Sequence, residues 1–125
     1  MKKLYTYVVP RSFNKYYIPI AIQSCYLKDY SQRSKLEFVL PITELSTSDV
    51  FIKLKAILKK KNTNLAMTSI FILPINKPKL LNKLLKNVSI KNKFHFVLEN
   101  LILNKKEILE WTLDYRKYSR IIKEF

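Results

Sequence analysis

Four short apolar runs alternate along this chain with four segments of helical periodicity, and this order constrains the fold more than any other feature. The apolar runs occupy residues 4–9, 36–40, 65–73 and 94–98. The helical segments occupy residues 18–32, 50–61, 78–85 and 105–123. Strands that alternate with helices usually pair in parallel, because each helix carries the chain back across a face of the sheet. We therefore predict one α/β domain over residues 1–125: a small, open, mainly parallel four-stranded sheet with helices on both faces, in three layers.

Polar residues and prolines mark the expected helix ends. Residues 46–49 and Asn76 offer side-chain caps for the second and third helices. Pro19 fits the first turn of the first helix, where its missing N–H costs little. Because the chain contains no Gly, we expect Asn62 or Asn64 to adopt the left-handed conformation that ends the second helix.

The absence of Gly also excludes two kinds of phosphate-binding site. A P-loop needs Gly where backbone N–H groups approach the phosphate, and a dinucleotide-binding fingerprint needs three glycines. Any phosphate must therefore be bound by side chains or by an ordinary helix N-terminus. One His and one Cys cannot build a common zinc site. A carboxylate-rich magnesium site stays open, but no motif indicates one. We expect no metal and no cofactor.

We expect a cytoplasmic protein. Cys25 is the single cysteine, which permits no internal disulfide and fits a reducing compartment. No apolar run approaches the roughly 18 residues that a membrane-spanning helix needs, so no membrane insertion is expected. The apolar run after Lys2 and Lys3 is too short for a signal peptide and is stopped by Pro10.

The formal net charge of +15 has two interpretations. It suits an acidic partner such as nucleic acid, an anionic membrane or a phosphorylated substrate. It also fits the codon bias of an AT-rich genome, since Lys, Asn and Ile are plentiful and only four of the 24 basic residues are Arg. Specific nucleic-acid recognition favours the bidentate contacts of Arg. We therefore interpret the charge mainly as codon bias, which predicts lysines spread over the surface and no specific nucleic-acid partner.

Polar residues follow three of the four apolar runs, at the ends where parallel sheets bind their ligands. Arg11 and Ser12 follow the first run, Thr43 and Glu44 the second, and Glu99 the fourth. Arg11 can hold a carboxylate or phosphate through its planar fork, and Ser12 can bind or attack a substrate. Glu44 can act as a general base or hold sugar hydroxyls. The alternative is that these residues form surface loops and begin the next helices.

A second group of candidates lies away from those ends. On the first helix these candidates are Gln23, Lys28, Asp29 and Tyr30. Lys28 and Asp29 also fit a solvated ion pair without function. His95 and Glu99 are four residues apart in the fourth run, so a strand would project both to the same face. His95 is either a site residue or a hydrogen-bonded core residue between two Phe side chains.

The last helix carries an apolar stripe with spacings of 3, 4, 3 and 4 residues. Its members are Ile108, Trp111, Tyr115, Tyr118 and Ile122. Such a stripe covers a sheet or seats a partner helix. We predict that Ile108 or Trp111 packs on the sheet. Tyr118 and the last turn then remain exposed for a second copy of the chain or for a pathway enzyme.

These residues together resemble a known family. The shared pattern consists of Pro10-Arg11-Ser12-Phe13, Pro19, Gln23, Lys28-Asp29-Tyr30, Thr43-Glu44, Ser69-Ile70-Phe71-Ile72-Leu73-Pro74 and Phe94-His95-Phe96-Val97-Leu98-Glu99. In order and spacing it resembles the sporadic carbohydrate cluster proteins, a small bacterial family encoded among surface-polysaccharide biosynthesis genes. The resemblance covers about residues 5–102. Family members carry Gly-Tyr where this chain has Thr6-Tyr7, and tend to carry Arg where it has Lys28.

The resemblance implies a role in making a glycan, with a sugar or nucleotide-sugar bound at the strand ends. The candidate catalytic residues are then Ser12, Glu44 and Glu99, and the candidate ligand-binding residues are Arg11, Gln23, Lys28, Asp29, Tyr30, Thr43, Ser69 and His95. Whether the chain catalyses a reaction or only binds stays open. The alternatives are a basic nucleic-acid-binding module and a non-catalytic subunit that docks on a pathway enzyme.

A second resemblance concerns the fold alone. The catalytic domain of serine recombinases also has a small parallel sheet, with a serine just after the first strand, where Ser12 stands here. That activity needs several arginines to stabilise the phosphoryl transition state. Only Arg11 and Arg33 are available for that role in this chain, and no helix-turn-helix segment follows. We therefore carry over the Rossmann-like, resolvase-like fold and not the activity.

Overall fold

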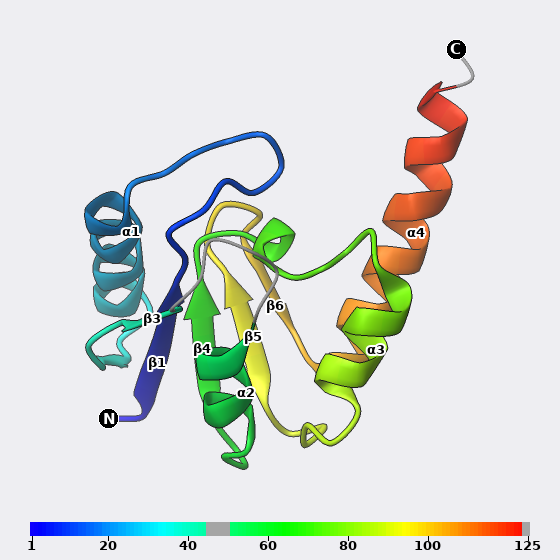
Figure 1. Ribbon diagram of the computed structural model, residues 1–125. Helices are drawn as coiled ribbons and strands as arrows, with labels where there is room; N and C mark the ends of the chain where they lie inside the picture. The colour runs from blue at the N-terminus through cyan, green and yellow to red at the C-terminus, as the bar shows by residue number, and fades with distance from the viewer. Residues whose placement is uncertain (45–50, 124–125) are drawn as a thin grey trace.

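The sheet of this protein is mainly parallel and is covered by helices on both faces. The computed structural model describes residues 1–44 and 51–123 (Figure 1). Its strands are β1 (Lys3–Val8), β2 (Glu37–Phe38), β3 (Ile42–Thr43), β4 (Asn64–Met67), β5 (Lys93–Phe96) and β6 (Leu101–Leu103). They lie in the order β2-β1-β4-β5-β6, and β3 also pairs with β1. Only the pairing of β5 with β6 is antiparallel within the described residues, so the predicted fold class is confirmed.

Six strands occur in this sheet where four were expected. The predicted second strand, residues 36–40, is reduced to β2, which pairs with the start of β1. The unpredicted strand β3 follows it and pairs with the end of β1. Between them the Thr6 hydroxyl donates a hydrogen bond of 2.8 Å to the Val39 carbonyl oxygen. Pro41 follows and has no N–H to donate. A side-chain hydrogen bond and a proline thus separate β2 from β3.

The sixth strand follows from a tight reversal of the chain after β5. The predicted fourth strand ends at Phe96, and residues 97–100 form a turn. Asn100 has a φ of 54°, a left-handed conformation that Asn tolerates better than most residues. The chain then returns as β6, with Phe96 opposite Leu101.

The predicted third strand is also shorter than expected. Strand β4 ends at Met67, and the 3₁₀ helix η1 (Ile70–Ile72) replaces the second half of the apolar run. The Ser69 hydroxyl accepts a hydrogen bond from the Phe71 N–H at 3.1 Å, which turns the backbone out of the extended conformation. An apolar run of nine residues was therefore wrongly predicted as one strand, because the turn depends on a side chain inside it.

The four predicted helices are present. They are α1 (Ile20–Arg33), α2 (Ile52–Leu58), α3 (Pro78–Leu85) and α4 (Lys105–Lys123). Asn62 has the expected left-handed conformation, with a φ of 56°, but it lies in the turn after α2 and does not end the helix, whose C-cap is Lys59. Asn64 begins β4. Pro19 precedes the first turn of α1, and α3 begins after Lys77 without a side-chain cap from Asn76. The proposed caps at residues 46–49 lie outside the described residues.

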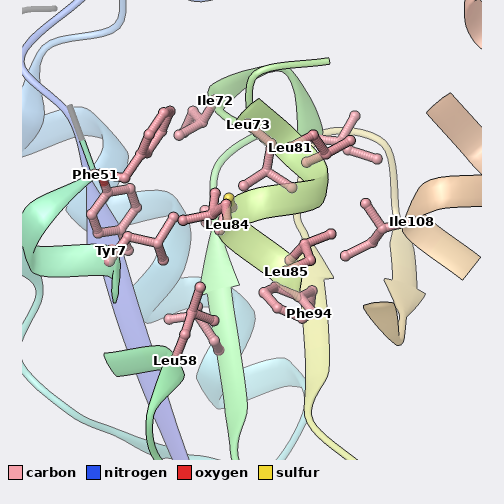
Figure 2. Close-up of a cluster of buried hydrophobic side chains, with 14 of the residues drawn as sticks. Tyr7, Phe51, Leu58, Ile72, Leu73, Leu81, Leu84, Leu85, Phe94 and Ile108 are labelled. Carbon is pink, nitrogen blue, oxygen red and sulfur yellow. The ribbon is translucent and has the colours of Figure 1, made fainter. Parts of the chain in front are cut away.

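Both faces of β1 are buried, as its two sets of apolar side chains predict. Tyr7 and Val9 enter a large cluster beneath α2, α3 and α4, which Figure 2 shows from within. Leu4 and Val8 enter a smaller cluster with Leu27 and other residues of α1. Helix α1 therefore covers one face and the other three helices cover the opposite face, so the three-layer arrangement is confirmed.

Helix α4 packs on the rest of the molecule from its start to about Tyr115 and Arg116. The Ile108 side chain is fully buried, and the Trp111 and Tyr115 rings stack with centroids 5.4 Å apart, both edge-on to Phe71. Tyr118 is 63% exposed, and the last turns extend away from the rest of the molecule (Figure 1). The predicted division of this helix into a packed and an exposed part is confirmed.

Replacing Ile108 by Ala should lower the free energy of unfolding by about 2–5 kcal/mol, because the cavity would open inside the large cluster. Replacing the exposed Leu113 on the same helix by Ala is the matched control and should change the free energy of unfolding by less than roughly 0.5 kcal/mol. Urea denaturation followed by circular dichroism measures both. Equal effects of the two variants would show that α4 is not part of the core.

Candidate functional site

The carboxyl ends of the parallel strands form the edge where a ligand site was expected. From β1 the sheet extends to β2 and β3 on one side and to β4 on the other, so the strand order reverses between β1 and β4. Such a switch point is where open α/β sheets bind ligands. Six candidates lie at this edge or just after it: Arg11, Ser12, Thr43, Glu44, Ser69 and Glu99.

Glu44 is held in a buried network at the start of α2. Its carboxylate accepts a hydrogen bond of 2.7 Å from the Tyr7 hydroxyl, and further ones from the backbone N–H groups of Lys53 and Leu54 at 3.2 and 3.4 Å. Burial and the neighbouring Glu44 carboxylate raise the pKa of the Tyr7 hydroxyl, which therefore remains a donor. With 2% of its surface exposed, Glu44 serves the first turn of α2, as the helix-start interpretation proposed.

Arg11 connects the loop after β1 to the two elements beside it. Its Nη2 donates a hydrogen bond of 2.7 Å to the Ile72 carbonyl oxygen of η1. Its guanidinium lies over the Phe51 ring, 5.5 Å from the centroid. The side chain is half-buried, while Ser12 beside it is exposed. The guanidinium is thus placed at the switch-point edge by contacts on both sides.

Two exposed aromatic side chains follow in the same loop, and sequence reasoning did not single them out. Phe13 and Tyr16 form a two-residue bridge with reciprocal backbone hydrogen bonds of 2.9 Å. The residues between them have positive φ angles, which closes a tight hairpin turn. Tyr16 and Tyr17 are left largely exposed. The signal for them in the sequence was a pair of adjacent tyrosines in an otherwise polar loop.

Gln23 is a structural residue rather than the wall of an open site. Its side chain is fully buried, and it bonds both backbone groups of Val9: Oε1 accepts from the N–H at 3.2 Å, and Nε2 donates to the carbonyl at 2.9 Å. Nε2 also donates to the Ile18 carbonyl oxygen at 2.7 Å. Gln23 therefore closes the loop of residues 10–18 at its base.

Lys28 and Asp29 of α1 are exposed and do not join the other candidates. Asp29 forms an ion pair of 2.8 Å with Arg33, one helical turn further on. This is the solvated-pair alternative, with Arg33 in place of Lys28 as the partner. Thr43 is also exposed, at the end of β3.

Ser69 and Glu99 meet at the ends of β4 and β5, although they are thirty residues apart. The Ser69 hydroxyl donates to Glu99 Oε2 at 2.7 Å, and the Ile70 N–H donates to Oε1 at 2.7 Å. Both groups therefore stabilise the start of η1. The Thr68 hydroxyl beside them is buried and has no hydrogen-bond partner among the described residues.

His95 does not share a face with Glu99, because β5 ends before Glu99 is reached. His95 is 5% exposed and lies on the α1 side, where Nδ1 is 2.5 Å from the Tyr30 hydroxyl and Nε2 is 2.9 Å from Asn64 Oδ1. Burial, with Lys93 nearby, lowers the pKa of His95 to about 4. The neutral ring accepts from Tyr30 and donates to Asn64, which is the hydrogen-bonded core alternative.

The lowered pKa of His95 predicts a pH-dependent stability. The unfolded chain takes up the proton near pH 6.5 and the folded protein only near 4. The neutral ring's stabilising contribution is therefore complete above pH 6.5 and declines as the pH falls toward 4, by up to about 3 kcal/mol. Unfolding by urea at several pH values measures this slope. In His95→Gln, which cannot titrate, that part of the slope should vanish; an unchanged slope would contradict a buried neutral histidine.

The Glu44 network predicts a large stability effect as well. Glu44→Ala leaves the Tyr7 hydroxyl and two N–H groups without their acceptor, which should cost about 1–3 kcal/mol of unfolding free energy. Glu37→Ala removes an exposed carboxylate from β2 and is the control, with an expected change of less than roughly 0.5 kcal/mol. Thermal unfolding of the two variants, compared with the wild type, decides whether Glu44 has this structural role.

Two further properties bear on the site. Among the side chains of the described residues, no group of three His, Cys, Asp or Glu comes together as metal ligands. In that same part of the chain, no helix has both the length and the apolar character to cross a membrane.

Comparison of the sequence with protein-family models and with curated proteins returned no match.

Proposed function

We propose that this chain is a cytoplasmic protein of surface-polysaccharide biosynthesis that binds a sugar or nucleotide-sugar at the carboxyl edge of its sheet. The sugar class comes from the family resemblance of the Pro10-Arg11-Ser12-Phe13 and Thr43-Glu44 segments. The exposed, free Cys25 fits the reducing conditions of the cytoplasm. The carboxylates of Glu44 and Glu99 accept hydrogen bonds from backbone N–H groups and therefore have structural roles. For this reason we propose that the chain binds the sugar, and we assign no reaction to it.

One observation carries the proposal: the loop after β1 presents complementary groups for a sugar phosphate at the switch point. This loop runs along the carboxyl edge of the sheet (Figure 1). Arg11 supplies a guanidinium for phosphate, and Ser12 supplies a hydroxyl for sugar hydroxyl groups. The exposed rings of Tyr16 and Tyr17 offer apolar faces for the C–H surfaces of a sugar, with a polar tip beside them.

Binding of UDP-glucose, UDP and glucose 1-phosphate to the full chain, measured by ligand-observed NMR and calorimetry, tests the proposal. Tyr17→Ala and Ser12→Ala change exposed side chains and should each weaken binding by roughly threefold to tenfold, about 0.7–1.4 kcal/mol. Tyr26→Ala on α1 removes another exposed ring, which lies away from the loop, and is the control. If none of the three compounds binds, or if Tyr26→Ala weakens binding as much as Tyr17→Ala, the proposal fails.

A non-catalytic docking role is a second candidate, favoured by the exposed end of α4. Tyr118 and Ile122 continue the apolar stripe beyond the sheet and are 63% and 71% exposed. Aromatic residues are enriched in interfaces, and exposed Ile adds apolar area. On this reading the docking partner is a second copy or an enzyme of the same pathway, with α4 as the contact.

A further inference from the structure

A basic hollow lies at the opposite, amino-terminal edge of the sheet. Its volume is about 930 Å³. Twelve residues line it, among them Lys2, Lys3, Lys61, Lys91 and Lys93. Five of these residues are lysines and none is acidic, so five positive charges surround one hollow.

The topology brings these lysines together. In a parallel sheet all the strands start at one edge, and here Lys3 starts β1 and Lys93 starts β5. Lys61 and Lys91 lie in the turns that lead into β4 and β5. Segments far apart in the sequence thus meet at the lower end of the molecule in Figure 1. The hollow continues onto the part of the sheet beside α1, where Ile102 of β6 is 54% exposed.

The positive charges of the hollow lack acidic partners within residues 1–44 and 51–123. None of the five lysines forms an ion pair with a carboxylate of the described residues. Glu37 is opposite Lys3 in the β1–β2 register, but it is outside the lining of the hollow. Like charges around a concave surface raise its potential, and a bound anion relieves their repulsion. The hollow is therefore suited to a ligand with several negative charges.

Neutral donors complete the lining. His95 Nε2 and Asn64 Oδ1 are 2.9 Å apart, and the neutral ring donates to that oxygen. The side chain of Asn64 can then donate its amide N–H groups to a ligand. The Thr63 hydroxyl, also in the lining, is a second neutral donor. Tyr5, Leu36 and Ile102 add apolar surface for the organic part of a ligand. Cations and N–H donors together are the groups that bind phosphate oxygens.

We propose that this hollow binds a ligand with two or more linked phosphates, as in a nucleoside diphosphate or a diphosphate headgroup. A single phosphate carries about two negative charges near neutral pH, too few for five lysines, whereas a diphosphate carries about three. The lysines surround one hollow rather than forming a stripe, which favours a compact anion over a long nucleic acid. This site is separate from the proposed sugar site and does not depend on it.

Calorimetry with inorganic pyrophosphate tests the proposal on the full chain. The double variant Lys91→Gln/Lys93→Gln removes two exposed charges of the hollow and should weaken pyrophosphate binding by at least roughly tenfold. The control Lys106→Gln/Lys117→Gln makes the same charge change on α4 and should weaken pyrophosphate binding by less than roughly threefold. Tyr17→Ala, which tests the sugar site, should leave pyrophosphate binding unchanged.

The other ligands distinguish the sources of the diphosphate. If UDP binds to the wild type but not to the Lys91→Gln/Lys93→Gln variant, the result supports a soluble nucleotide as the ligand of the hollow. Binding to vesicles that contain a polyprenyl diphosphate, without binding of UDP, supports a lipid headgroup. The proposal is overturned if pyrophosphate does not bind, if the two double variants lose affinity equally, or if orthophosphate binds as tightly as pyrophosphate. Tighter binding of a single-stranded oligonucleotide, lost in the hollow variant, would instead make this surface a nucleic-acid interface.

Discussion

The structure depends on the pairing of β1 on both of its sides. Its first half pairs with β2, its second half with β3, and residues 4–7 pair with β4 on the other side. Because both faces of β1 are also covered, its residues must be apolar or internally bonded, as Thr6 is. The same pairing creates the switch point, since the next strands lie on opposite sides of β1. Arg11 reaches the carboxyl edge because it directly follows this strand.

The two edges of the sheet use their polar side chains differently. At the carboxyl edge Gln23, Glu44 and Glu99 accept hydrogen bonds from backbone N–H groups, so they fix the loop after β1, the start of α2 and the start of η1. Buried side-chain acceptors thus satisfy backbone donors where this chain, without Gly, turns sharply. At the amino edge the five lysines of the hollow have no such partners among the described residues, and we propose that an external anion balances their charge.

The sequence allowed the fold class to be predicted because its signals are local. The alternation of strands and helices, the two faces of β1 and the extent of α4 can each be read from neighbouring residues. What could not be predicted depends on contacts between distant residues. The hydrogen bond from Thr6 to Val39 lies between β2 and β3, and the hydrogen bond from Ser69 to Glu99 lies at the start of η1. The same holds for the site. Local patterns placed Arg11 and Glu44 at one edge, but they gave neither the partner groups of Glu44 nor the lysines that three separate segments bring to the hollow.

The length of β1 separates the two proposed sites physically. Its six residues span about 20 Å at roughly 3.3 Å per residue, with the loop of Arg11 at one end and Lys3 at the other. The buried core and α1 lie between them, so a ligand bound at one end cannot reach the other around the sheet. A nucleotide-sugar that occupied the hollow would leave the tyrosine loop empty, and one bound at the loop would leave the lysines uncompensated. The two sites therefore take separate molecules, and each can be lost by mutation without loss of the other.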